Sequence, residues 1–112
     1  MLKKLYNKLA PVSTVIVGNV GQIHHVISTK IARALDGHAI LAGTFIKRDN
    51  RLVTQAIDLT AHRGYQRWHR DLDDEVGEYI RNHPNITLST FVDYLKGVYD
   101  RPDIKARFPD GF

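Results

Sequence analysis

Apolar residues recur along the second half of the chain at the spacing of amphipathic helices. The longest pattern runs from Ala61 to Arg81, where apolar positions return every three or four residues and fall on one arc. These positions are Tyr65, Trp68, Leu72, Val76 and Tyr79. The pattern predicts a long helix over 61–81 that places these side chains in the core.

A second helix is predicted after the Asn-His-Pro-Asn segment at 82–85, which ends the first one. Thr87 or Ser89 would cap this helix, and Pro102 would stop it. Its apolar face would consist of Phe91, Leu95 and Val98. Residues 103–112 are then expected to form an irregular segment that packs back on the helices.

The first part of the chain contains two short runs that are typical of strands. Residues 13–17 (Ser-Thr-Val-Ile-Val) are rich in β-branched side chains, and residues 22–27 (Gln-Ile-His-His-Val-Ile) form a second such run. Residues 1–10 carry three lysines and predict a basic helix. A short helix capped by Ser28 or Thr29 is expected to follow the second strand.

The segment between that short helix and residue 54 is expected to turn the chain back on itself. Asp36-Gly37 would end the helix. The apolar residues 39–47 fit either a strand or a buried loop. Residues 48–51 predict a turn before an extended segment at 52–54, so a β-hairpin is expected around Asp49-Asn50.

The composition is that of one small soluble domain. With 112 residues, 43% of them apolar, the chain predicts a single domain over 1–112 with a modest core. No apolar run approaches the roughly 20 residues that a membrane span needs. The absence of cysteine excludes disulfides, thiolate catalysis and cysteine-ligated zinc. The formal charge of +4 favours polyanions as partners but is weak support alone.

Polar side chains suited to metal binding and proton transfer follow one another in a strand, a turn and a helix. Adjacent residues of a strand point to opposite faces, so His24 and His25 are expected to have different tasks. One can bind a metal ion while the other accepts a proton from water. On the predicted helix, the polar stripe opposite the apolar arc consists of His62, Gln66, His69 and Asp73.

Three segments in this order resemble the HNH (His-Me finger) nuclease superfamily, in particular nuclease colicins and the C-terminal toxin domains of bacterial polymorphic toxins. The segments are Ile-His24-His25-Val-Ile, Asp49-Asn50-Arg-Leu-Val-Thr54 and Ala-His62-Arg-Gly-Tyr-Gln66. The resemblance covers about residues 23–76. It implies an α+β fold with a ββα-metal core, extended by C-terminal helices over about 83–112.

The resemblance also implies a role for each residue of the motif. His24 would bind the metal ion, and His25 would be the general base. Asn50 would brace the loop that bears His25. His62 would be a metal ligand on the helix. Apart from the resemblance, the place of Arg63 next to His62 makes it a candidate catalytic contact with the phosphate.

The third metal ligand is open between two residues. Where the family usually has a second helix histidine, this chain has Gln66, an oxygen ligand that favours Mg²⁺ or Mn²⁺ over Zn²⁺ or Ni²⁺. His69 is the alternative, ranked lower because about 10 Å would separate it from His62 along an ideal helix. One divalent ion is expected in either case.

Several basic side chains flank the predicted site and could contact the backbone of a nucleic acid. The flanking residues are Lys47, Arg48, Arg51, Arg63, Arg67 and Arg70, of which Lys47, Arg51 and Arg67 are the predicted nucleic-acid contacts. The alternative is an ordinary solvated surface, because acidic residues at 71–75 partly cancel the charge. His38 and His83 are expected to be solvated and outside the site.

The sequence thus predicts an endonuclease that hydrolyses DNA without sequence preference, with RNA as the alternative substrate. The toxin resemblance implies delivery into the cytoplasm of a target cell and a cognate, acidic immunity protein as partner. The competing hypothesis is a non-enzymatic basic module that binds nucleic acid or protein and has structural histidines. A third class is a metal-dependent hydrolase of another substrate.

Overall fold

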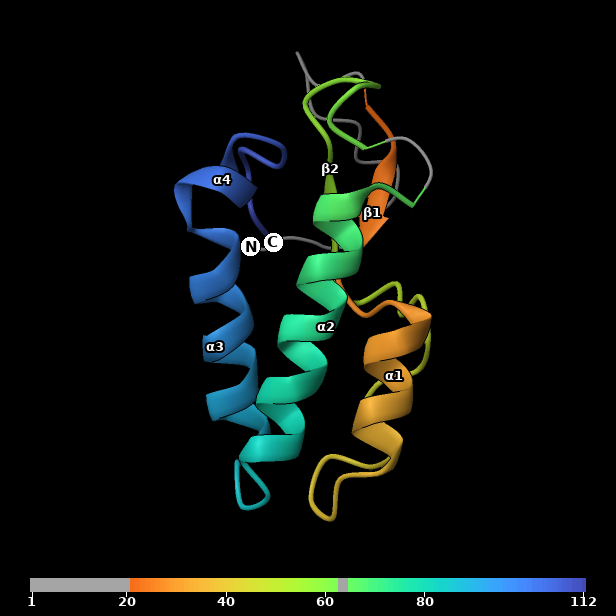
Figure 1. Ribbon diagram of the computed structural model, residues 1–112, viewed down its shortest axis with the longest axis vertical. Coiled ribbons are helices and arrows are strands. Elements are labelled where there is room, and N and C mark those ends of the chain that lie inside the picture. Colours follow the sequence, from red (N-terminus) through yellow and green to blue (C-terminus); the bar gives the residue numbers. More distant parts are fainter. Residues whose placement is uncertain (1–20, 63–64) are drawn as a thin grey trace.

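Residues 21–62 and 65–112 are described by the computed structural model, and they form a small α+β domain (Figure 1). Strands β1 (Ile23–His25) and β2 (Val53–Gln55) pair antiparallel, with His24 opposite Thr54. The helices are α1 (Thr29–Asp36), α2 (Arg67–Asn82), α3 (Leu88–Tyr99) and α4 (Pro102–Lys105). Helix α2 lies between α1 and α3, with the two strands near its first turns. The strand predicted at 13–17 and the helix predicted at 1–10 lie outside the described residues.

The transition from β1 to α1 follows the sequence prediction. Val26 and Ile27 are buried, and Ser28 then caps α1 by accepting a hydrogen bond from the Ile31 backbone N–H at 3.1 Å. Gly37 is the C-cap. Helix α1 buries Ile31, Ala32 and Leu35 toward the core, which includes the neighbouring face of α2.

The segment between the two strands is longer than a simple hairpin because it contains α1 and a buried loop. Leu41 and Phe45 are buried within 39–47, where no strand forms, so the loop alternative is confirmed. The predicted turn at 48–51 is also confirmed. Its centre is the buried carboxylate of Asp49, which accepts hydrogen bonds from the backbone N–H groups of Ile46 and Arg51.

His38 is buried, so the prediction of a solvated histidine is wrong. Its Nδ1 accepts hydrogen bonds from the backbone N–H groups of Ile40 and Leu41, each at 3.0 Å. Its Nε2–H donates to the carbonyl oxygen of His83 at 2.8 Å. The ring therefore accepts hydrogen bonds from two backbone N–H groups of its own loop and joins that loop to the end of α2.

Helix α2 begins at Arg67, so the predicted start at Ala61 is wrong. The Asp58 carboxylate accepts a hydrogen bond from the Ala61 backbone N–H at 2.8 Å, which forms a local turn before the helix. Gln66, in an extended conformation, is the N-cap of α2. Tyr65 consequently lies outside the helix with 47% of its surface exposed, which corrects its predicted place in the core. The predicted apolar face is confirmed for Leu72 and Val76.

Helix α3 matches its prediction closely, and the tail adds a short helix. Thr87 is the N-cap, and the buried face consists of Phe91, Leu95, Val98 and Tyr99. Pro102 does not lead into a purely irregular tail, because it occupies the first turn of α4, where proline is tolerated. The predicted packing of the tail on the helices is confirmed, with Phe108 fully buried.

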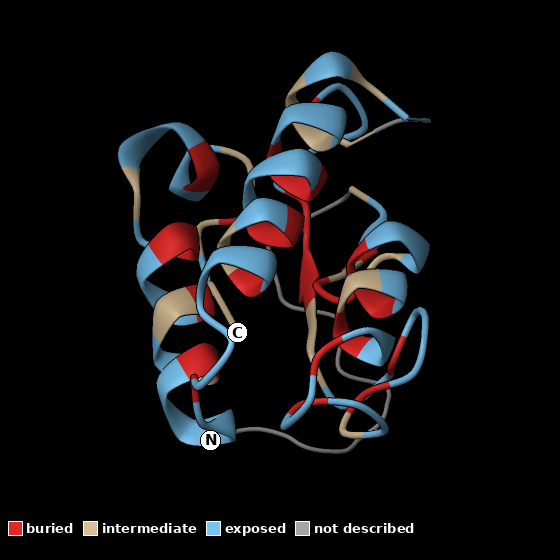
Figure 2. Cartoon of the chain, turned by 60° about the horizontal axis from the view of Figure 1, so that its bottom comes forward, coloured by how far each residue is buried: buried red, intermediate tan, exposed pale blue. Residues whose placement is uncertain are grey.

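The buried faces of the helices point toward the interior of the molecule and together form the core (Figure 2). Its largest fully buried side chains are Phe91, Phe108, Ile27, Ile31, Leu35 and Leu41. Among the residues that the structure describes, no helix is both long and apolar enough to cross a membrane.

Candidate metal centre

Three histidines from different parts of the chain converge near the first turn of α2. His24 comes from β1, His62 from the segment before α2, and His69 from α2 itself. Each offers one ring nitrogen, and these nitrogens all lie within 4.8 Å of one another. Two imidazoles on one zinc ion place their nitrogens about 3.4 Å apart, since each Zn–N bond is about 2.1 Å. Adjustments of about an ångström would therefore bring the triad onto a single ion.

His24 is the most enclosed member of the triad, with 2% of its surface exposed. Its Nε2 lies 2.6 Å from the Tyr99 hydroxyl, and its ring stacks on Phe108 at a centroid distance of 4.6 Å. Burial is the main reason that the pKa of His24 falls to about 2, and the neighbouring His69 adds to the effect. The ring is neutral at neutral pH, which is the form that binds metals.

His62 is oriented by a hydrogen bond at the edge of the site. Its Nδ1 lies 3.0 Å from Gln22 Oε1. An amide oxygen can only accept, so Nδ1 carries the proton and Nε2 keeps a lone pair for an ion. Burial lowers the pKa of His62, and its neighbour His69 lowers it further.

His69 is held in the site without hydrogen bonds to its ring. Both ring nitrogens are buried, and neither has a hydrogen-bond partner among the described residues. Burial lowers the pKa of His69, although the nearby Asp73 carboxylate opposes this. A buried polar atom without a partner is costly, so binding of a metal ion would remove a penalty that the ion-free protein bears.

A buried carboxylate stands beside His69. Asp73 Oδ1 accepts a hydrogen bond from Ser28 Oγ, and Oδ2 accepts one from the Tyr65 hydroxyl, both at 2.9 Å. Oδ1 lies 3.8 Å from His69 Nε2, beyond hydrogen-bond distance. Through these two hydrogen bonds, Asp73 on α2 joins the cap of α1 and the segment before α2 at the edge of the triad.

His25 and Asn50 form a pair next to the triad. His25 Nε2 lies 3.0 Å from Asn50 Oδ1. Since that oxygen accepts, Nε2 carries the proton and Nδ1 keeps the lone pair of a base. Burial lowers the pKa of His25, while the hydrogen bond to Asn50 acts in the opposite direction. Asn50 therefore contacts the side chain of His25 itself, where the sequence predicted a contact with its loop.

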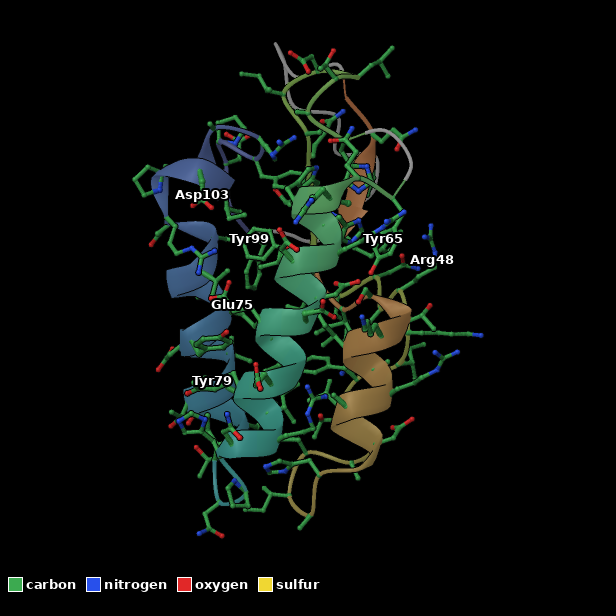
Figure 3. All side chains as sticks on the ribbon, viewed as in Figure 1. Arg48, Tyr65, Glu75, Tyr79, Tyr99 and Asp103 are labelled. Carbon is green, nitrogen blue, oxygen red and sulfur yellow. The ribbon has the colours of Figure 1, made fainter. Side chains whose placement is uncertain are left out.

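The four histidines line one cavity of about 460 Å³ between the strands and the starts of α1 and α2. In Figure 3, the labelled side chains of Arg48 and Tyr65 lie on this side of the molecule, whereas Tyr79 and Tyr99 lie toward α3. The remaining described residues of the lining are Ile23, Ser28, Thr29, Lys30, Arg33 and Asp73.

Comparisons of the chain with protein-family models, curated proteins and solved structures found no match.

The metal ligands predicted from the sequence are brought together in part. His24, His62 and His69 meet, whereas the Gln66 side chain is turned to other partners. Its Oε1 accepts a hydrogen bond from Trp68 Nε1 at 2.7 Å, and its Nε2 donates to the Thr60 carbonyl at 3.2 Å. The ranking of Gln66 above His69 assumed that His62 belonged to the helix. The observed start of α2 removes that assumption.

The predicted contacts with nucleic acid do not line the cavity. Arg51 donates two hydrogen bonds to the Asp49 carboxylate and one to the Thr44 carbonyl. Arg67 is 3.9 Å from Asp71 and almost fully exposed, and Lys47 is exposed outside the lining. Arg63 lies outside the described residues.

Sequence analysis missed two neighbours of His24. Tyr99 belongs to α3 and Phe108 to the tail, so both are more than seventy positions away from His24 along the chain. The apolar pattern of α3 and the two phenylalanines of the tail predict burial, but no local signal indicates which strand they cover.

Proposed function

We propose that this chain is a metal-dependent endonuclease of the His-Me finger type that hydrolyses DNA phosphodiester bonds. The observation that carries the proposal is the pairing of two features on one cavity. Three imidazoles converge to within about an ångström of the spacing for one ion, and a fourth, His25, lines the same cavity with Nε2 engaged by Asn50 and Nδ1 as its basic atom. A ligand set and a separate base are what hydrolysis by an activated water requires.

The donor set fits a transition-metal ion better than Mg²⁺. Imidazole nitrogens suit Zn²⁺, Ni²⁺ and similar ions, whereas Mg²⁺ prefers oxygen ligands. The expectation of Mg²⁺ or Mn²⁺ depended on the amide oxygen of Gln66, which accepts hydrogen bonds from Trp68 Nε1 and Arg107. We therefore favour His24, His62 and His69 as ligands of one Zn²⁺ or Ni²⁺, and keep Mn²⁺ and Mg²⁺ as ions to be tested.

Hydrogen bonds from outside the triad would select the ligand atoms. With Nε2 of His24 engaged by the Tyr99 hydroxyl, Nδ1 would face the ion, and Nε2–H would donate to Tyr99. His62 would use Nε2, because Nδ1–H donates to Gln22. Such partners orient metal ligands and fix their tautomers.

The chemistry would divide between the ion and His25. When bound, a divalent ion supplies positive charge beside the phosphate and stabilises the leaving oxygen. Nδ1 of His25 accepts the proton of the attacking water, while the Nε2–H group stays hydrogen-bonded to Asn50 Oδ1. Asn50 thereby stabilises the imidazolium and holds the ring in orientation.

The order of elements supports the comparison with the ββα-metal core. Strands β1 and β2 and helix α2 would correspond to its two strands and helix, with α1 inserted between the strands. Delivery as a toxin, action in a target-cell cytoplasm and an immunity protein as partner follow from the motif resemblance alone, and they remain predictions.

The test is cleavage of supercoiled plasmid by purified protein in EDTA, Zn²⁺, Ni²⁺, Mn²⁺ and Mg²⁺. We expect nicking that depends on the metal, that falls at least a hundredfold in His25→Ala and His69→Ala, and that persists in Gln66→Ala. Intact plasmid and intact RNA in every ion, with folded protein, would contradict the proposal and favour the binding module.

A further inference from the structure

The proposed nuclease needs a means of holding its substrate strand, and the cations of the cavity wall provide one. Lys30, Arg33 and Arg48 all line the cavity. Lys30 is ion-paired with Asp74 across the α1–α2 contact. Arg33 and Arg48 have no carboxylate within ion-pair distance in the part of the chain that the structure describes.

Arg48 has a backbone conformation that favours glycine. Its φ of 53° lies in the left-handed region, which residues other than glycine rarely adopt. Its backbone N–H donates a hydrogen bond to the Ile27 carbonyl at 2.8 Å. The strain is held by the turn around Asp49, whose carboxylate binds Arg51. Arg51 thus neutralises Asp49, and Arg48 remains available at the rim of the cavity beside His25.

Arg33 belongs to helix α1. It lies one turn after Lys30 on α1, so the two side chains share a face of the helix. Both contribute to the cavity lining. Because α1 is fixed to α2 by the Lys30–Asp74 pair and by the Ser28–Asp73 hydrogen bond, Arg33 extends from a rigid support.

The charges in the cavity select an anionic ligand. Asp73 is the one carboxylate among the described lining residues, and its oxygens already accept hydrogen bonds from Ser28 and Tyr65. Arg33 and Arg48 carry positive charge that no carboxylate of the described residues pairs. A guanidinium group presents several N–H donors in a plane, which match the oxygens of a phosphate.

We propose that Arg33 and Arg48 bind backbone phosphates that neighbour the cleaved one in a DNA strand lying along the cavity they share with the histidines. This inference rests on the proposed nuclease function. It replaces the predicted contacts Lys47, Arg51 and Arg67 by Arg33 and Arg48 as the main contacts with the backbone.

The experiment measures binding rather than cleavage, in the His25→Ala background and in EDTA. Binding of a labelled DNA duplex is followed by fluorescence anisotropy over a series of salt concentrations, for Arg33→Gln, Arg48→Gln and the control Arg81→Gln. Arg81 loses the same charge but lies in the last turn of α2, about 18 Å along the helix from His69. Circular dichroism checks that each variant is folded.

We expect each cavity variant to weaken binding roughly fivefold to tenfold at about 0.1 M salt and to reduce the salt slope by about one, the signature of one lost phosphate contact. Arg81→Gln should leave both values unchanged. Equal effects in all three variants, or no binding by the parent, would overturn the inference. A labelled RNA strand is tested alongside, and exclusive binding of RNA would also overturn it.

The two proposals fail separately. Loss of binding in Arg33→Gln and Arg48→Gln together with a wild-type protein that never cleaves would reject the nuclease and leave the phosphate contacts standing. Cleavage by the wild type with normal binding in both variants would reject only the contacts.

Discussion

At the scale of single residues, the hydrogen bond between His25 and Asn50 decides which ring nitrogen can accept a proton. Nε2 faces the amide oxygen at 3.0 Å, which leaves Nδ1 as the basic atom. Without this partner, the neutral ring would divide between two tautomers and rotate more freely. The tautomer of the proposed base therefore depends on a neighbouring side chain.

Asn50→Ala is expected to lower kcat roughly tenfold to a hundredfold, because an orienting partner of a site residue typically contributes that much. Asn50→Asp keeps an acceptor oxygen and should retain more activity than the alanine variant. Cleavage rates at saturating DNA measure the effect, and zinc affinity is measured as the control. Equal kcat in wild type and Asn50→Ala would show that Asn50 does not position the base.

A second residue-scale prediction concerns the turn that carries Asn50. Hydrogen bonds from Arg51 lower the pKa of Asp49 from 3.8 to about 2. The ionised carboxylate then stabilises the fold fully above about pH 4, and this stabilisation disappears as the pH falls toward 2. The shift corresponds to about 2 kcal/mol, at 1.36 kcal/mol per pKa unit.

Denaturation of wild type and Asp49→Asn at a series of pH values measures this contribution. The wild-type advantage in unfolding free energy should be largest above about pH 4 and should shrink by about 2 kcal/mol at lower pH. Metal-free protein is used throughout. An advantage that is independent of pH would mean that the charge of Asp49 is not stabilising.

At the scale of elements, the position of β1 depends on a close approach at Gly21. A Cβ at this position would lie 2.5 Å from the Asp58 carbonyl oxygen and 2.6 Å from that of Ala56. Both obstacles are backbone atoms, so the strand itself would have to move. Gly97 in α3 is the contrasting case, since a Cβ there meets nothing within 4 Å.

Gly21→Ala is expected to destabilise the protein by about 1–3 kcal/mol, because the clash cannot be relieved by a side-chain rotation. It should also weaken zinc binding, since β1 carries His24. Gly97→Ala should stabilise α3 by up to about 1 kcal/mol and leave zinc affinity unchanged. Thermal denaturation and zinc titration measure both effects. A Gly21→Ala variant as stable as the wild type would contradict the close packing of Gly21 against residues 56 and 58.

Elements with strong local signals were predictable from the sequence. Ser28 and Thr87 were each one of two predicted caps, and the apolar face of α3 was expected, because short-range hydrogen bonds and helical spacing determine these features. The start of α2 was not. Helical periodicity continues back to Tyr65, but the Ala61 backbone N–H donates to the Asp58 carboxylate and forms a turn there instead. His62 therefore lies outside α2, which removes the reason for ranking His69 below Gln66 as a metal ligand.

At the scale of the whole molecule, the C-terminal tail completes the site. Phe108 stacks on His24, and the backbone N–H of Ile57 donates to the Arg107 carbonyl at 2.8 Å. Arg107 also donates to the Ala61 carbonyl at 2.7 Å, next to His62. Such contacts join segments that are distant in sequence, so composition and periodicity could not predict them.

The central claim is that His24, His62 and His69 bind one metal ion while Gln66 does not. Calorimetric titration of metal-free protein with Zn²⁺ tests it most directly, with His69→Ala and Gln66→Ala as matched variants from the same region of the chain. The account predicts one zinc ion per chain in the wild type and in Gln66→Ala, and at least a hundredfold weaker binding in His69→Ala. Zinc binding that survives His69→Ala, or that is lost in folded Gln66→Ala, would contradict it.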